Sequence, residues 1–145
     1  MNAGVSAGFL RRAAALLYDG LLLGALLVAF TAAALALNHG RAILPESAGA
    51  WTYLYRAGLG AVAAAYFVAN WARSGQTLGM RAWHLCAVDE RGMRLTAGRA
   101  ALRFICAVAA WLPAALGVLW LYVDPQRLAL HDRLSRTRLL HLTRS

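Results

Sequence analysis

Asp19 is the residue best placed to do chemistry in this chain of 145 residues, because it is a carboxylate inside an otherwise uncharged apolar stretch. That stretch, Ala13 to Leu37, is long enough to cross a bilayer at about 1.5 Å per residue. A carboxylate at mid-depth costs roughly 2.5 to 3.5 kcal/mol on insertion scales, so it needs a partner, water or a proton. Asp19 is therefore a candidate proton or cation carrier, since burial favours its neutral form and a nearby arginine its charged form.

Two arginines are candidate partners for Asp19. Arg12 lies seven residues earlier on the same helix face, about 10 Å away along the axis, and we expect it to reach cytoplasmic lipid headgroups instead. Arg103 stands at the entry to a later apolar segment at a similar expected depth, so we predict that it pairs with Asp19. Such a pair would be either a structural pin that fixes helix register or an ion or proton site, and the residues leave both open.

Asp132 is the second carboxylate of interest. It follows His131 in a tail rich in Arg and Leu, where a helix cap or an arginine partner at the interface is expected more than a catalyst. Cys86 and Cys106 are too few and too far apart for a metal ribbon or a redox motif, and the four histidines lack metal-ligand spacing. We find no nucleophile–base pair and no phosphate loop, so we expect no enzyme activity, no metal and no cofactor.

Composition indicates a membrane protein. Apolar residues make up 61% of the chain, charged residues only 14%, and the charges gather at the ends of apolar runs. All fifteen basic residues are arginine, and the net charge is +9. The sequence lacks the aromatic and basic ladder of RNA-binding proteins, so we expect anionic lipid headgroups as the partner and no nucleic acid.

Three apolar segments organise the chain as a single membrane domain over residues 1–145. They cover residues 13–37, 51–72 and 104–123, and Pro113 interrupts the third. The pattern predicts an all-α membrane protein with two transmembrane helices and a broken third segment. That third segment is either a re-entrant helical hairpin or a kinked span.

The distribution of arginine in the loops predicts orientation. The connector 73–103 and the tail 124–145 are rich in arginine, whereas the connector 38–50 carries only one. By the positive-inside rule the N-terminus and the connector 73–103 are cytoplasmic. A hairpin at 104–123 keeps the tail on that side as well, whereas a full crossing would place the tail outside.

The connector 73–103 also predicts a small β-hairpin at the membrane surface. Short apolar stretches flank a turn at residues 89–92, and the tail segment 137–142 could add a third strand. Trp71 and Trp83 are expected to anchor this region at the interface.

Three ordered blocks of the sequence resemble the RDD family of bacterial membrane proteins. GFLRRAAALLYDGLLLG resembles its first helix, with Arg12 as the family arginine and Asp19 as the first aspartate. GQTLGMR, VDERGMRLT and AALRF resemble its middle, and DPQRLALHDRLSRTRLL resembles its C-terminal signature, with Asp132 as the second aspartate. The chain departs from the family at Arg136, where a small residue is more usual before Thr137.

The resemblance implies a multi-pass protein of the bacterial cytoplasmic membrane, and it leaves two classes of function open. The first is transport of small solutes, including cation/proton exchange, which is suggested for some members of the family. At this size a transporter would need an oligomer to build a pathway that uses Asp19. The second is a non-catalytic module that assembles with itself or with another membrane protein, with Arg12, Asp19 and Asp132 as structural pins.

Overall fold

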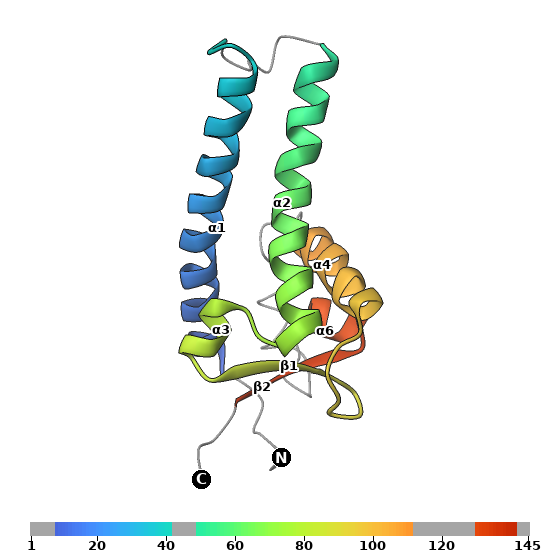
Figure 1. Cartoon of the computed structure of the whole chain (residues 1–145). Helices are drawn as coiled ribbons and strands as arrows, with labels where there is room; N and C mark the ends of the chain where they lie inside the picture. The colour runs from blue at the N-terminus through green and yellow to red at the C-terminus, as the bar shows by residue number, and fades with distance from the viewer. Residues whose placement is uncertain (1–7, 42–48, 112–129, 142–145) are drawn as a thin grey trace.

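Two long helices and a small group of elements at one of their ends make up the described part of the protein (Figure 1). The computed structural model describes residues 8–41, 49–111 and 130–141. Helices α1 (Phe9–Leu37) and α2 (Ala50–Ser74) run antiparallel. At the end where α1 begins, the chain forms α3 (Leu78–Ala82), β1 (Leu85–Asp89), α4 (Ala97–Trp111), α6 (Leu130–Leu134) and β2 (Thr137–His141). We call α3, β1, α6 and β2 the platform.

Helix α1 confirms the first predicted segment and begins four residues earlier, so that it includes Arg11 and Arg12. Among the described helices it alone is long and apolar enough to cross a membrane by length and composition. Only 6% of its most apolar window is buried inside the protein. Its surface is therefore suited to lipid and not to the core of a soluble domain.

Helix α2 occupies the second predicted segment and continues to Ser74. It carries Arg56 and Asn70 within its length and does not reach the same apolar standard, so a second membrane crossing stays a prediction. Gly75 ends the helix with a left-handed φ of 72°, a conformation that suits glycine, and its N–H binds the carbonyl of Trp71. This turn sends the chain back toward α1.

An aromatic contact joins α1 and α2 away from the platform. The rings of Phe30 and Tyr55 stack with centroids 6.1 Å apart, and the hydroxyl groups of Thr31 and Tyr55 are 2.9 Å apart. A Cβ on Gly58 would come within 2.3 Å of the Phe30 ring. The two helices therefore approach closely at Gly58, where α2 has no side chain.

The β-sheet differs from the predicted hairpin. β1 pairs antiparallel with β2 from the tail, with Leu85 opposite His141 and Asp89 opposite Thr137. The tail strand was predicted. Across the turn at 89–92, however, the described residues form only one isolated β-bridge, between Val88 and Arg94. The hairpin is short because the chain soon turns into α4, which begins at Ala97. The tail strand β2 pairs with the opposite edge of β1, since Val88 lies between Arg94 and Arg138.

The apolar core lies where the sheet meets the helix ends. Trp71 belongs to this core and is only 7% exposed, so the prediction that it anchors the membrane interface is wrong, whereas Trp83 is 43% exposed. The Trp71 ring packs against Phe67, which in turn contacts Phe104 of α4. The buried core residues are Ala15, Trp71, Met80, Leu85, Ala87, Leu95, Ala100 and Leu139.

The third apolar segment is described only in its first part. α4 begins at Ala97, seven residues before the predicted start at Phe104, and it ends at Trp111. The predicted break at Pro113, and with it the choice between a re-entrant hairpin and a kinked span, lies outside the described residues.

Candidate functional site

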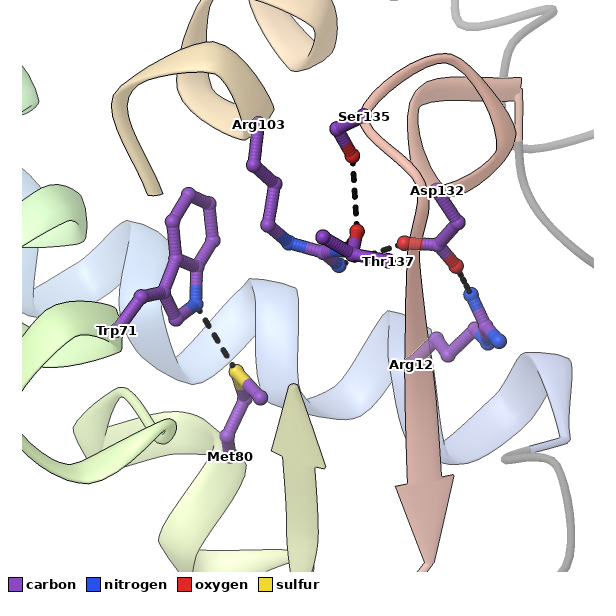
Figure 2. Close-up of polar contacts among 7 residues, drawn as sticks. All are labelled: Arg12, Trp71, Met80, Arg103, Asp132, Ser135 and Thr137. Atoms are coloured by element: carbon purple, nitrogen blue, oxygen red, sulfur yellow. Dashed lines mark hydrogen bonds and ion pairs between the residues drawn. The ribbon is translucent and has the colours of Figure 1, made fainter. Parts of the chain in front are cut away.

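Asp132 is fully buried and forms ion pairs with two arginines, Arg12 and Arg103. The carboxylate belongs to α6 and is 0% exposed. Nη1 of Arg12 lies 2.5 Å from its Oδ2, and Nη2 of Arg103 lies 2.7 Å from its Oδ1, as Figure 2 shows. We call these three residues the Asp132 node. It joins the start of α1, the middle of α4 and the tail of the chain.

Arg103 also contacts two residues outside the Asp132 node, Thr137 and Trp71. Its Nη1 donates a hydrogen bond to Oγ1 of Thr137, whose hydroxyl lies 2.8 Å from that of Ser135 (Figure 2). Its guanidinium carbon lies 5.1 Å from the centroid of the Trp71 ring, a cation–π contact. Arg103 therefore fixes α4 against both α2 and the tail.

Asp19 is the second buried carboxylate, and it is held by neutral donors. Its Oδ1 accepts hydrogen bonds from the hydroxyl of Tyr66 at 2.7 Å and from the backbone N–H of Gly79 at 2.8 Å. Its Oδ2 accepts from the hydroxyl of Thr77 at 2.5 Å. Asp19 is 3% exposed. We call these four residues the Asp19 node, and it joins α1, α2 and α3.

Two residues of the sequence GQTLGMR fit α3 against α1. Thr77 caps the N-terminus of α3, since its Oγ1 accepts from the backbone N–H of Met80, and this leaves its hydroxyl proton for Asp19. A Cβ on Gly79 would lie 2.3 Å from the carbonyl oxygen of Ala15 and 2.8 Å from Cγ of Asp19. Only glycine allows this close approach.

The predicted pair of Asp19 and Arg103 does not form among the described residues. Arg103 binds Asp132, because α3 folds back on α1 and supplies donors at the depth of Asp19. The prediction that Arg12 reaches lipid headgroups is also wrong, since Arg12 is 4% exposed and binds Asp132. The prediction that Asp132 partners arginine is confirmed, though its site is buried and not an exposed interface.

The three residues that donate hydrogen bonds to Asp19 were not predicted from the sequence. Tyr66 carried a signal, because a hydroxyl inside an apolar segment needs a partner. Thr77 precedes a short helical stretch, which is a typical N-cap pattern. Gly79 carried no signal of its own beyond its place in a recognisable block.

Asp89 lies outside both nodes, in the turn after β1. Its pKa is lowered by hydrogen bonds from the backbone N–H groups of Met93 and Arg91, and by the charge of Arg99, whose Nη1 is 2.8 Å away. The carboxylate therefore holds the turn closed in its ionised form.

Two further titratable groups belong to the strands of the sheet, Cys86 to β1 and His141 to β2. Burial raises the pKa of the Cys86 thiol. Burial also lowers the pKa of His141, and the neighbouring charges of Arg11 and His84 add to that shift. Within residues 8–41, 49–111 and 130–141 no group of three His, Cys, Asp or Glu side chains could hold a metal ion.

Together the fold and its two nodes define a small helical membrane protein whose apolar helix is tied to a platform by buried polar contacts. α1 is an integral part of this fold, because Arg12 and Asp19 bind the tail and the connector. The sequence model of the RDD family matches residues 6–136, and the chain belongs to the RDD family. No curated protein and no solved structure matched it.

Proposed function

We propose that this protein is a non-catalytic membrane module whose nodes hold the platform rigidly on its helices, so that the platform can assemble with another membrane protein. The observation that carries the proposal is that the three family signature residues hold parts of this chain together. Arg12, Asp19 and Asp132 are all buried in contacts between elements of the same chain. Groups used in this way serve to position the platform and not to bind a substrate.

The surface of the platform supports a partner with an acidic face. Arg91 and Arg94 in the turn after β1, and Arg136 and Arg138 in and beside β2, are all exposed. Among the acidic residues that the structure describes, Glu90 alone is exposed. A surface with charge of one sign favours association with the opposite sign.

We further propose a multi-pass topology in the bacterial cytoplasmic membrane, with the N-terminus and the platform in the cytoplasm. Most exposed arginines of the described residues lie at the platform end, while Arg41 and Arg56 lie toward the other end. A Glu90→Cys variant without the two native cysteines should resist impermeant maleimide on intact cells and react after lysis. Labelling of intact cells would contradict this topology.

Transport by an oligomer is the second candidate, and one observation favours it. Asp19 is a buried carboxylate in the apolar helix, and the described residues give it neutral donors and no arginine. These donors, however, come from α2, Thr77 and α3 of the same chain, so Asp19 is engaged in contacts that hold the fold together. The hydrogen bonds thus favour a pin over a carrier.

Ion flux separates the two functions. The protein is reconstituted in liposomes under gradients of protons, sodium or potassium, and Asp19→Asn and Glu90→Gln variants are measured in parallel. If Asp19 has only a structural role, none of the three proteins should carry ion flux above that of empty liposomes. Flux in the parent protein and in Glu90→Gln, but not in a folded Asp19→Asn, would establish transport.

Assembly is tested in native membranes with a photo-crosslinking amino acid at one of two positions. The first is Glu90, in the turn that follows β1 of the platform, and the second is Val28, which is 70% exposed on α1. The proposal predicts a discrete protein adduct from position 90. It also predicts that the adduct disappears when Arg136 and Arg138 are both replaced by Glu. Lipid adducts alone at position 90 would contradict assembly through the platform.

A further inference from the structure

Helix α3 has a buried face and an exposed face of different character. Gly79 and Met80 face inward against α1 and the core. On the outside, Leu78 is 45% exposed, Trp83 just after the helix is 43% exposed, and Arg81 is exposed as well. A short segment with apolar, aromatic and arginine side chains on one surface is typical of a membrane–water interface.

The length of α1 places this segment relative to the membrane. The uncharged run from Ala13 to Leu37, Asp19 aside, spans about 37 Å, whereas the hydrocarbon core is about 30 Å thick. The run is therefore longer than the core by about 7 Å, or roughly five residues. α3, which carries Arg81, packs on α1 beside Ala15 and Asp19 (Figure 1). The excess thus lies at the platform end, and the hydrocarbon begins near Tyr18, next to Asp19.

We infer that α3 is a membrane-surface helix whose outer side chains Leu78, Arg81 and Trp83 lie in the headgroup layer of anionic phospholipids. Arg81 would meet the phosphate groups, while Leu78 and the Trp83 ring reach the upper acyl chains. The inference uses α1 as the membrane span from the proposed topology and is independent of assembly.

The Asp19 node has a specific task in this arrangement. It holds α3 at a fixed height on α1 through the hydroxyl of Thr77 and the N–H of Gly79. Exposed Arg11 and Arg73 stand at the same end of the helices, so the charge of this region matches an anionic leaflet. Asp19 thus marks the hydrocarbon boundary and not the middle of the bilayer.

Quenching of tryptophan fluorescence by brominated lipids measures the depth of α3. The parent protein and a Trp83→Phe variant are placed in bilayers with bromine either near the headgroups or near the chain ends, and the difference gives the contribution of Trp83. We expect stronger quenching of Trp83 by the shallow bromines. Trp71→Phe is the matched control, because the buried Trp71 should contribute little quenching at either depth.

Stronger quenching by the deep bromines, or none at either depth, would overturn the inference. A spin label at Leu78→Cys, in a chain without Cys86 and Cys106, gives an independent depth from collisions with oxygen and with a polar relaxant. It should report the headgroup boundary. A label exposed fully to water would contradict a membrane-surface helix even if a tryptophan variant failed to fold.

The identity of the headgroup is tested by lipid exchange. Lipid-stripped protein is offered phosphatidylglycerol or phosphatidylcholine, and the Trp83 emission reports binding. We expect preference for phosphatidylglycerol to fall about fivefold in Arg81→Gln, the factor that corresponds to ~1 kcal/mol per arginine at an anionic surface. An unchanged preference in a folded Arg81→Gln would show that α3 does not bind the anionic headgroups.

Discussion

Asp19 and Asp132 are both buried carboxylates at the platform end of the molecule, yet their partners differ in kind. Asp132 is bound by two guanidinium groups, whereas Asp19 is bound by two hydroxyls and one backbone N–H. Removing Asp132 would leave the buried Arg12 and Arg103 without their counter-charge. Removing Asp19 would leave only neutral groups behind, which costs less.

The two nodes also connect different parts of the chain. Arg12 and Asp132 are 120 positions apart, so the Asp132 node joins the beginning of α1 to the tail. Asp19 and Thr77 are 58 positions apart, and the Asp19 node joins α1 to the connector after α2. Loss of Asp132 should therefore release the tail strand, whereas disturbance of the Asp19 node should displace α3.

The largest effect is expected for Asp132→Leu. The substitution strands two buried arginines, and removal of one partner of a buried pair costs roughly 3–5 kcal/mol. The free energy of unfolding in detergent micelles should fall by about this amount. Glu90→Leu, which changes an exposed carboxylate, should have little effect.

Replacing the whole Asp132 node tests the reason for that loss. When Arg12, Arg103 and Asp132 are all changed to Leu, no charge remains buried, and such replacements are often neutral. The triple variant should recover most of the stability that Asp132→Leu loses. A triple variant as unstable as the sum of the single variants would show that the three residues act independently.

Gly79→Ala should have the next largest effect, because its Cβ would clash with the backbone of Ala15. The expected loss is about 1–3 kcal/mol, as for other overpacked positions. Gly20→Ala on α1 is the control, since nothing lies within 4 Å of its Cβ. Equal thermal stability of the two variants would argue against the close contact of α3 and α1.

Arg136→Gly should stabilise the turn that follows the Asp132 node. Arg136 has a φ of 51°, in the left-handed region that glycine adopts without strain. We expect the free energy of unfolding to rise by up to about 1 kcal/mol. Arg138→Gly, within β2, should lower it instead. A loss of stability in Arg136→Gly would mean that its side chain contributes more than the strain costs.

Asp89, whose carboxylate lies outside both nodes, should give the smallest effect, and this effect depends on pH. Because its pKa is lowered in the folded protein, its contribution to stability is present above the unfolded value of about 3.9. The contribution is lost as the pH falls through the lowered pKa. Asp89→Asn should therefore be less stable than the parent at neutral pH and approach it in acid. Parallel pH profiles of melting temperature would contradict this.

Much of the local structure could be predicted from the sequence. The uncharged run predicted α1, and the tail segment 137–142, which was expected to add a strand, contains β2 (Thr137–His141). The RDD resemblance is confirmed over residues 6–136, and the unusual position of Arg136 coincides with a backbone conformation that explains why a small residue suits it.

The partners of Asp19 could not be predicted, because they depend on how the chain turns in space. Sequence patterns place Asp19 and Arg103 at similar depths, but they do not show that α3 folds back on α1 and supplies the donors to Asp19. That turn requires Gly75 in a left-handed conformation and Gly79 without a side chain. Neither requirement is visible before the neighbouring backbone is known.

The reactivity of Cys86 tests most directly whether the Asp132 node holds the tail strand on the platform. Cys86 lies in β1 opposite Leu140 of β2 and is 8% exposed, so its thiol reacts only when the platform opens. In a chain with Cys106→Ala, maleimide labelling should be slow, and Asp132→Asn should accelerate it at least about tenfold, the factor for 1.4 kcal/mol. Glu90→Gln should leave the rate unchanged. A folded Asp132→Asn protein that is labelled as slowly as the parent would contradict the structural role of the node.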